Sequence, residues 1–272
     1  MLNIPLQDST FKQLRDFIYE TSGIFIPDIK KYFLENRLIK RLQEKNINSF
    51  EDYLYLLKYS ANGDELAKLF DAVTTNETFF FREQQQLDVF FNFIIPEVTK
   101  TRGTDNLKIW SAACSTGEEP YTIVMMHKER MSTVRMDVFA SDISAGVLKS
   151  AVNAVYSSYS VRNVPEPFLK KYFRVNGHAY ELEHSIKNSV KFMNINLVDE
   201  KKMRFMRDVD VIFCRNVLIY FDDRAKQKVV SFLYGSLKTR GFLFIGTSES
   251  LHNITRAFRP VIFNRVVVYQ KV

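Results

Sequence analysis

A change from apolar to small polar residues near the middle of the chain marks a segment that could bind a ligand. Residues 107–110 predict a buried strand, and the small residues 111–115 lead into a turn at Gly117. A helix is expected to begin at Glu118 and Glu119. A strand, a tight loop and a helix in this order bring backbone atoms close to a ligand at the end of a parallel sheet.

The ligand of this loop is not expected to place a phosphate there. Only Gly117 is present, so the three-glycine fingerprint of dinucleotide-binding folds is absent. Glu118 and Glu119 would repel a pyrophosphate at the helix N-terminus, where such groups usually bind. A nucleoside with a cationic end and no phosphate fits better, and S-adenosylmethionine is such a ligand.

A second strand, expected over residues 136–140, is followed closely by Asp142. A carboxylate at the tip of this strand is placed to accept hydrogen bonds from both ribose hydroxyls. The alternative is that Asp142 caps the helix that runs through Leu148 and Val152. The loop of residues 112–117 favours the ribose interpretation.

Two further segments carry polar groups. Asn76, Thr78 and Arg82 offer an amide, a hydroxyl and a guanidinium, which suit contacts to a carboxylate and to a reacting oxygen. Composition alone favours a simpler role for that segment, as a capped helix start. The strand expected at residues 209–214 ends in Arg215 and Asn216, at the edge where such sheets bind ligands.

The elements that position these residues divide the chain in two. Residues 10–73 predict four short helices, and from Leu107 onward strands alternate with helices, which indicates a mainly parallel sheet covered on both faces. The later strands are expected at residues 190–195, 209–214, 242–247 and 265–270. Because no long crossover helix follows Gly241, an antiparallel strand is expected near the end. Asn176-Gly177 predicts a hairpin outside this pattern, either a decorated connection or an edge strand that pairs with a peptide.

Composition excludes several classes of protein. The chain is 46% hydrophobic with 24 Phe and 13 Tyr, so an ordered core is expected. Cys114 and Cys214 resemble small buried residues, and the four histidines lack metal-ligand spacing. No apolar run reaches membrane-spanning length, and the first nine residues do not resemble a signal peptide. A cytoplasmic protein without metal or membrane insertion is therefore expected.

The net charge of +7 is concentrated most strongly in residues 30–45. On a helix, Lys30, Arg37 and Arg41 would form one basic stripe. A solvated helix face and a docking surface for an acidic partner are equally open interpretations. The remaining basic residues are spread along the chain with few interleaved aromatics, which disfavours a nucleic-acid partner.

Four longer strings stand out along the chain: TTNETFFFRE at residues 74–83, WSAACSTGEEPY at 110–121, FASDI at 139–143 and IFCRNVLIYF at 212–221. In these strings and their order the chain resembles the CheR family, the bacterial methyltransferases that esterify glutamates of chemoreceptors. The resemblance covers nearly the whole chain. It implies a class I S-adenosylmethionine-dependent methyltransferase fold, Rossmann-like and α/β, with a mostly parallel sheet and an antiparallel last strand. The implied parts are an all-helical domain (1–75), a cofactor-contacting segment (76–86) and a methyltransferase domain (87–272) with a β-subdomain at about 172–188.

The resemblance also implies the roles of particular residues. Arg82 and Tyr220 become candidates for positioning the reacting carboxylate, although base rates slightly favour a core position for Tyr220. Asn194 and Asn196 both offer a side-chain amide, so which of the two faces the adenine of the cofactor stays open. The cofactor contacts carried over by motif are Asn76, Thr78, Arg82, Glu119, Asp142, Asn196, Leu197, Arg215 and Asn216.

The implied reaction transfers a methyl group from S-adenosylmethionine to a receptor glutamate and leaves S-adenosylhomocysteine. A carboxylate is ionised at neutral pH, so no general base is required. The expected partner is the cytoplasmic signalling domain of a chemoreceptor, with a receptor tail on the β-subdomain and the enzyme acting as a monomer. Two alternatives are a receptor-docking adaptor that has lost turnover and a nucleic-acid methyltransferase. The second is disfavoured because residues 215–218 lack the Asn/Asp-Pro-Pro-aromatic loop of amine-directed enzymes.

Overall fold

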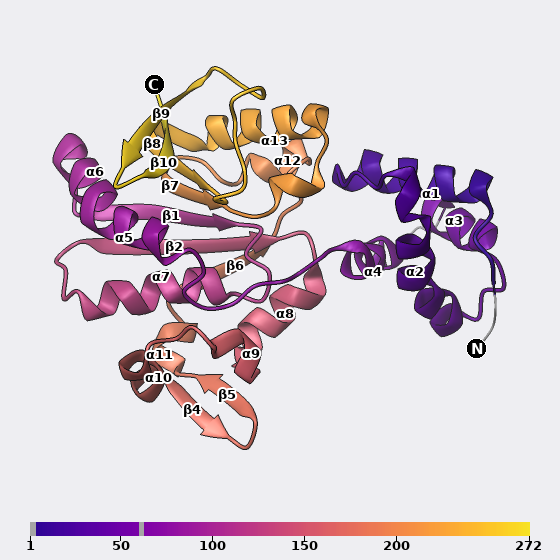
Figure 1. The fold of residues 1–272 in the computed structure, drawn as a ribbon, viewed down its shortest axis with the longest axis horizontal. Coiled ribbons are helices and arrows are strands. Elements are labelled where there is room, and N and C mark those ends of the chain that lie inside the picture. Colours follow the sequence, from indigo (N-terminus) through magenta and orange to yellow (C-terminus); the bar gives the residue numbers. More distant parts are fainter. Residues whose placement is uncertain (1–3, 60–62) are drawn as a thin grey trace.

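The computed structural model describes residues 4–59 and 63–272. A group of helices at the N-terminus is followed by a larger part built around a seven-stranded sheet (Figure 1). Within the described residues, no helix is both long enough and apolar enough to cross a lipid bilayer.

The N-terminal part contains the four helices that the sequence predicts. They are α1 (Asp8–Ser22), α2 (Lys31–Lys45), α3 (Phe50–Tyr59) and α4 (Asp64–Val73), with a 3-10 turn, η1 (Asp28–Lys30), before α2. Helix α1 ends at Gly23, whose φ of 75° is left-handed and whose N–H bonds back to Tyr19. Apolar residues at helical spacing, among them Leu14, Leu34 and Leu38, are fully buried and form a separate core.

The main sheet has the strand order β6-β2-β1-β7-β8-β10-β9. Its strands are β1 (Asn106–Ala112), β2 (Arg135–Asp142), β6 (Val190–Asn194), β7 (Val209–Cys214), β8 (Leu237–Ile245), β9 (Phe258–Phe263) and β10 (Val266–Lys271). The first five strands in this order run parallel, and β10 is antiparallel to both β8 and β9. The expected antiparallel strand near the end is confirmed. Strand β9 was not predicted.

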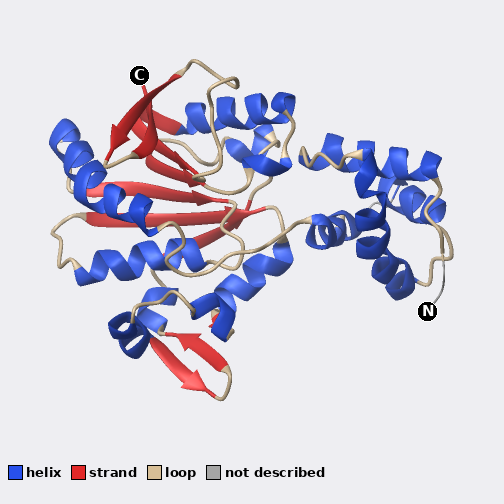
Figure 2. Ribbon diagram, viewed as in Figure 1, coloured by secondary structure: helices blue, strands red, loops and turns tan. Residues whose placement is uncertain are grey.

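Helices cover both faces of the sheet, as Figure 2 shows. Side chains alternate along β1, so Ile109 belongs to one core and Trp110 to the other. One face packs against α5 (Gln84–Val89), a π-helical turn η2 (Phe90–Ile94), α6 (Ile95–Arg102), α7 (Glu118–Glu129) and α8 (Ala145–Asn153). The other packs against α12 (Glu200–Met203) and α13 (Asp223–Ser236). A short 3-10 turn, η3 (Leu218–Tyr220), follows β7.

A small three-stranded sheet lies apart from the main one, with the order β3-β5-β4 (Figure 1). Strands β4 (Phe173–Asn176) and β5 (Ala179–Leu182) form the hairpin predicted from Asn176-Gly177, and Gly177 has the positive φ of 60° that this turn needs. The third strand, β3 (Val155–Tyr156), was not predicted. Short helices α9 (Ser158–Val161), α10 (Glu166–Tyr172) and α11 (His184–Lys187) complete this subdomain.

Direct contacts join the helical domain to the large one. Asp71 on α4 accepts hydrogen bonds from the Ser144 hydroxyl (2.7 Å) and the Gly146 N–H (2.9 Å), at the start of α8. Beyond α1, Ile24 forms an isolated antiparallel bridge with Phe221. At Gly23, even a Cβ atom would lie 2.7 Å from the Val198 side chain, so the two domains approach closely there.

Candidate functional site

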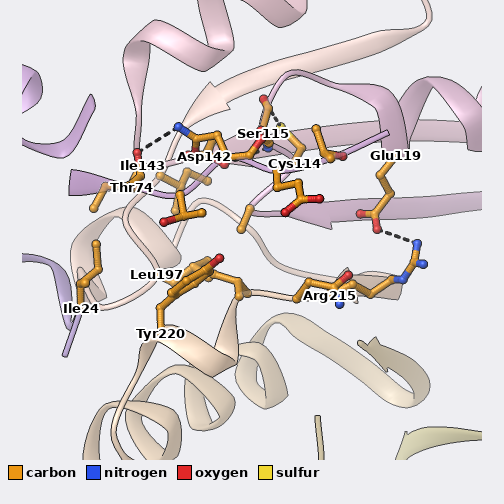
Figure 3. Close-up of a pocket in the computed structure, with 18 of the residues that line it drawn as sticks. Ile24, Thr74, Cys114, Ser115, Glu119, Asp142, Ile143, Leu197, Arg215 and Tyr220 are labelled. Atoms are coloured by element: carbon orange, nitrogen blue, oxygen red, sulfur yellow. Dashed lines mark hydrogen bonds and ion pairs between the residues drawn. The ribbon is translucent and has the colours of Figure 1, made fainter. Parts of the chain in front are cut away.

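A cavity opens at the carboxyl ends of β1, β2 and β7, the edge at which parallel sheets bind ligands (Figure 3). Its empty space is about 1100 Å³, a figure that includes open solvent at its mouth. The structure brings all nine residues implied as cofactor contacts to this cavity, and Tyr220 as well. They are Asn76, Thr78, Arg82, Glu119, Asp142, Asn196, Leu197, Arg215 and Asn216.

The loop between β1 and α7 adopts an unusual backbone conformation. Ala113, Ser115 and Gly117 all have positive φ values, of 63°, 50° and 91°. This conformation is costly for the two residues that have side chains, and such strain is commonly stored where a loop meets a ligand. The Cys114 N–H bonds to the carbonyl of Ser141 (2.9 Å), which fixes the loop against the end of β2.

The two carboxylates at the start of α7 have different environments. Glu119 lines the cavity, and its Oε1 accepts a hydrogen bond from the Ser111 hydroxyl (2.6 Å). Glu118 is buried and accepts one from the Thr116 hydroxyl (2.7 Å), and burial raises the pKa of its carboxyl. Of the two, Glu119 is the carboxylate that can meet a ligand.

Asp142 ends β2 with its side chain directed at the cavity (Figure 3). Its Oδ2 accepts a hydrogen bond from the Ser115 N–H (2.9 Å), and its Oδ1 accepts one from the Ser144 N–H (3.0 Å). Burial raises the pKa of this carboxyl, and the two N–H groups oppose the rise. Each oxygen keeps a lone pair for a further donor. The interpretation of Asp142 as a helix N-cap is wrong, because Ser144 caps α8.

Arg215, directly after β7, is a buried hub. Its Nη1 donates to Glu119 Oε2 (2.9 Å), and its Nη2 donates to Glu83 Oε2 (3.0 Å) and to the carbonyl of Arg82 (2.7 Å). A buried guanidinium needs such partners because an unpaired charge is costly in the protein interior. These donors are therefore used within the protein, and Arg215 positions its neighbours on the cavity wall.

Glu83 supports two lining residues, Arg215 and Asn216, and the sequence reasoning missed this role. Its Oε1 accepts hydrogen bonds from Thr247 Oγ1 (3.0 Å) and Asn216 Nδ2 (3.3 Å), and its Oε2 pairs with Arg215. Burial raises the pKa of Glu83, but the charge and hydrogen bonds of Arg215, together with hydrogen bonds from Asn216 and Thr247, lower it overall. The only signal in the sequence was its place directly after Arg82.

The segment from Thr74 to Arg82 crosses the cavity in an irregular conformation, so its interpretation as a helix start is wrong. Phe80 and Phe81 anchor it in the main core. The carbonyl of Asn76 accepts a hydrogen bond from the Ser115 hydroxyl (3.1 Å), which joins the segment to the β1–α7 loop. Asn76, Thr78 and Arg82 then line the cavity.

The opposite wall comes from the segments after β6 and β7. In Figure 3, Leu197 and Tyr220 lie across the cavity from Asp142 and Cys114. Tyr220 is half-buried and lines the cavity, so the slight preference for a core position was wrong. The helical domain closes this side, because Ser22 and Ile24 line the cavity and the Phe25 N–H bonds to the carbonyl of Tyr220 (2.9 Å).

The structure separates the two asparagines that the sequence left open. The Asn194 amide donates to the carbonyls of Asp142 (3.0 Å) and Ile143 (2.8 Å), and Asn194 itself does not line the cavity. Asn196 lines the cavity, while its Nδ2 donates to the carbonyl of Thr21 (2.7 Å) in the helical domain. Asn196 therefore connects the cavity wall to α1.

The predicted basic stripe is only partly helical and only partly exposed, because Lys30 belongs to η1 and α2 begins at Lys31. Lys30 and Arg37 are exposed, whereas Arg41 makes two hydrogen bonds to Glu65 on α4 (3.0 and 2.8 Å). Glu65 is buried and also accepts a hydrogen bond from the Tyr53 hydroxyl (2.9 Å). Arg41 therefore holds the helical domain together, and the charge available to a partner lies on Lys30 and Arg37.

The charges of the lining suit a cationic ligand. Among the lining residues in the described part of the chain, three carboxylates (Glu77, Glu119 and Asp142) accompany two guanidinium groups (Arg82 and Arg215). The formal excess is one negative charge. S-adenosylmethionine has two positive groups and one carboxylate, so its net charge complements this lining.

Comparison with known proteins identifies both parts of the chain. Residues 9–74 match the model of the CheR methyltransferase all-alpha domain, and residues 76–267 match that of the CheR methyltransferase SAM binding domain. Chemotaxis protein methyltransferase 2 of Vibrio cholerae is 38% identical over 100% of this chain and 96% of its own length. The chemotaxis protein methyltransferase of Borreliella burgdorferi is 36% identical (92% of this chain, 91% of its own), and that of Escherichia coli is 34% identical (94% and 89%).

Proposed function

The chain belongs to the CheR methyltransferase family, and from this premise we propose that it methylates glutamate side-chain carboxylates in the cytoplasmic signalling domains of bacterial chemoreceptors. The products would be glutamate methyl esters, used in chemotactic adaptation. The observation that carries the proposal is the cavity itself, where Asp142 and Glu119 accompany Arg82 and Tyr220. The first two suit the cofactor, and the second two suit a carboxylate substrate.

The proposed reaction asks little acid–base chemistry of the protein. S-adenosylmethionine, when bound, supplies a methyl group on a positively charged sulfur. The substrate glutamate is already ionised at neutral pH, so its oxygen can attack without a general base. The residues of the chain have two tasks, which are to align the carboxylate and to keep water away from it.

Arg82 suits the first task without binding the carboxylate too tightly. Its Nη1 donates to the carbonyl of Glu77 (3.0 Å), and its guanidinium lies 5.7 Å from the centre of the Phe79 ring. A guanidinium has five N–H donors, so others remain for a substrate. An arginine that paired tightly with the substrate carboxylate would withdraw charge from the attacking oxygen and make it a weaker nucleophile. Tyr220 lines the opposite wall, which supports a role for it beside the path of the methyl group.

Two surfaces are candidates for receptor contacts. Lys30 and Arg37 beside α2 are exposed and suit the acidic helices of a receptor signalling domain. Strand β4 lies at the edge of the small sheet with Arg174, Val175 and Asn176 exposed, so a receptor tail could pair with it as an added strand. The enzyme would act as a monomer, so that a single copy of the chain makes both contacts.

The test of this function is transfer of a tritiated methyl group to membranes that contain the cognate chemoreceptors. Label that base releases as methanol identifies a methyl ester, and peptide mapping then locates the glutamate. Calorimetry with S-adenosylmethionine separates the enzyme from the adaptor alternative, since an adaptor with a degenerate site would not bind it. Binding without transfer to any receptor would overturn the proposed function.

A further inference from the structure

A second guanidinium, besides that of Arg82, lies over the ring of Phe79, a residue that lines the cavity. Arg162, at the C-terminal end of α9, has its guanidinium carbon 3.7 Å from the centre of the Phe79 ring. Phe79 lines the cavity, and the same ring lies 5.7 Å from the guanidinium of Arg82. The two positive charges therefore share one aromatic ring, and the distance between them cannot exceed the sum of these two distances.

The contacts of Arg162 hold it in place although it is exposed. Its guanidinium also lies 3.7 Å from the centre of the Tyr159 ring, and its Nη1 donates to the Tyr159 carbonyl (2.5 Å). Tyr159 is fixed in turn, because its hydroxyl donates to Glu77 Oε1 (2.8 Å). A guanidinium stacked between two rings loses little conformational freedom when it binds an anion.

The charge of Arg162 is not neutralised by these contacts, which are with two rings and one carbonyl oxygen. Guanidinium groups match the planar, bidentate geometry of carboxylates. An immobilised guanidinium that contacts the cavity-lining residue Phe79 therefore suits recognition of a carboxylate on a bound substrate. Arg82 lines the cavity and is assigned to the reacting glutamate, so Arg162 is available for another acidic group.

We infer that Arg162 binds a second acidic side chain of the substrate, about one helical turn from the methylated glutamate, and so helps to select which glutamates are methylated. This inference rests on the proposed function. Side chains three or four positions apart on a helix are neighbours, with Cβ atoms about 5–6 Å apart. Long acidic side chains at that spacing can reach two guanidinium groups that contact one aromatic ring.

The experiment compares the enzyme and its variants on matched substrates. The substrate is the cytoplasmic fragment of the cognate receptor, with the methylated glutamate located as described above. Acidic residues three or four positions to either side of it are changed to Gln, one at a time. The enzymes are wild type, Arg162→Gln and Arg259→Gln, and kcat/KM is measured for each pair. Arg259 is an exposed arginine on the edge strand β9, so its variant has the same net charge as Arg162→Gln.

Removal of one acidic neighbour is expected to lower kcat/KM by about two- to five-fold for wild type and Arg259→Gln, the range of an exposed charge pair. Arg162→Gln should have the lowered kcat/KM already on the unchanged substrate. Replacing the acidic neighbour with Gln should then cause no further decrease in its kcat/KM. Arg162→Lys should recover part of the response because it keeps the charge. All variants should bind S-adenosylhomocysteine equally by calorimetry, since Arg162 is placed on the substrate side.

Two results would overturn the inference alone, while methyl transfer itself persists. One is an equal response to the neighbour in wild type and Arg162→Gln. The other is a wild-type enzyme that responds to none of the acidic neighbours. A wild-type enzyme that transfers no methyl group to any receptor glutamate would instead overturn the proposed function, and this inference with it.

Discussion

The carboxylate of Asp142 accepts a 2.9 Å hydrogen bond from the backbone N–H of Ser115, although the two residues are 27 positions apart in the sequence. The bond joins the end of β2 to the strained loop after β1. A change at Asp142 is therefore expected to affect both the proposed ribose contact and the support of the loop beside it.

Replacing Asp142 with Ala is expected to weaken the binding of S-adenosylhomocysteine by roughly ten-fold or more. The change removes charge-assisted hydrogen bonds, each worth about 1.5–3 kcal/mol. Calorimetry measures the affinity. Asp137→Ala is a suitable control, because Asp137 has a half-exposed side chain on the same strand. Equal affinities in the two variants would place the ribose site elsewhere.

The same carboxyl should make cofactor affinity depend on pH. Burial raises the pKa of Asp142 above its ordinary value of 3.8, so this carboxyl takes up a proton at a higher pH than an exposed aspartate does. The protonated form accepts fewer hydrogen bonds from ribose hydroxyls, so affinity should fall as the pH decreases. Calorimetry at several values from about pH 7.5 to about pH 5 checks this. Asp142→Asn should bind weakly at every pH, and a parallel decline in that variant would assign the titration to another group.

Glu83→Ala is expected to lower the free energy of unfolding by about 3 kcal/mol, because it leaves the buried Arg215 without one of its partners. Urea denaturation at neutral pH measures the change. Glu200→Ala, which removes an exposed pair with Arg204, should cost less than about 1 kcal/mol.

The contribution of Glu83 should also depend on pH, with a definite sign. Its pKa is lowered in the folded protein, so its stabilisation is present above the unfolded-state pKa of about 4.3. It is lost as the pH falls through the lowered folded-state value. The difference between wild type and Glu83→Gln should therefore shrink at acidic pH. A difference that grew there would contradict the assigned ion pair.

Replacing Lys30 and Arg37 together with Ala should slow receptor methylation, and more strongly at low salt. Both residues are exposed, and each exposed charge pair contributes about 0.2–1 kcal/mol. Arg41→Ala should behave differently, because Arg41 pairs with the buried Glu65. That variant should lose thermal stability in the helical domain. Initial methylation rates across a salt series, together with melting curves, distinguish the Lys30/Arg37 double variant from Arg41→Ala. Normal methylation rates in the double variant at every salt concentration would exclude this docking surface.

Much of the fold could be predicted because local patterns agree with the final packing. The helical spacing around Leu34 and Leu38, the apolar runs of β1 and β7, and the Asn176-Gly177 turn all point to the elements that form. Strand β9 was not predicted because Arg259 and Pro260 interrupt its apolar pattern. Strand β3 has only two residues, too few for a periodic signal.

The candidate site was harder to predict in detail, since its contacts join distant parts of the chain. Glu83 bonds to Arg215 and Thr247, which lie 132 and 164 positions away. The pairing of Arg41 with Glu65 likewise depends on how α2 packs against α4. A helical stripe indicates which residues share a face, but it does not indicate which face the neighbouring helix covers.

The close approach at Gly23 has a consequence for exchanging domains between relatives of this protein. A cut between residues 74 and 76 would follow the boundary between the two family domains. A helical domain taken from a relative would nevertheless bring its counterparts of Ser22 and Ile24 to the cavity wall. It would also bring its counterpart of Gly23 against Val198. Chimeras should therefore fold and bind cofactor only when the donor's loop after α1 fits the recipient's residues at this contact. That loop and the residues it touches would have to come from the same parent.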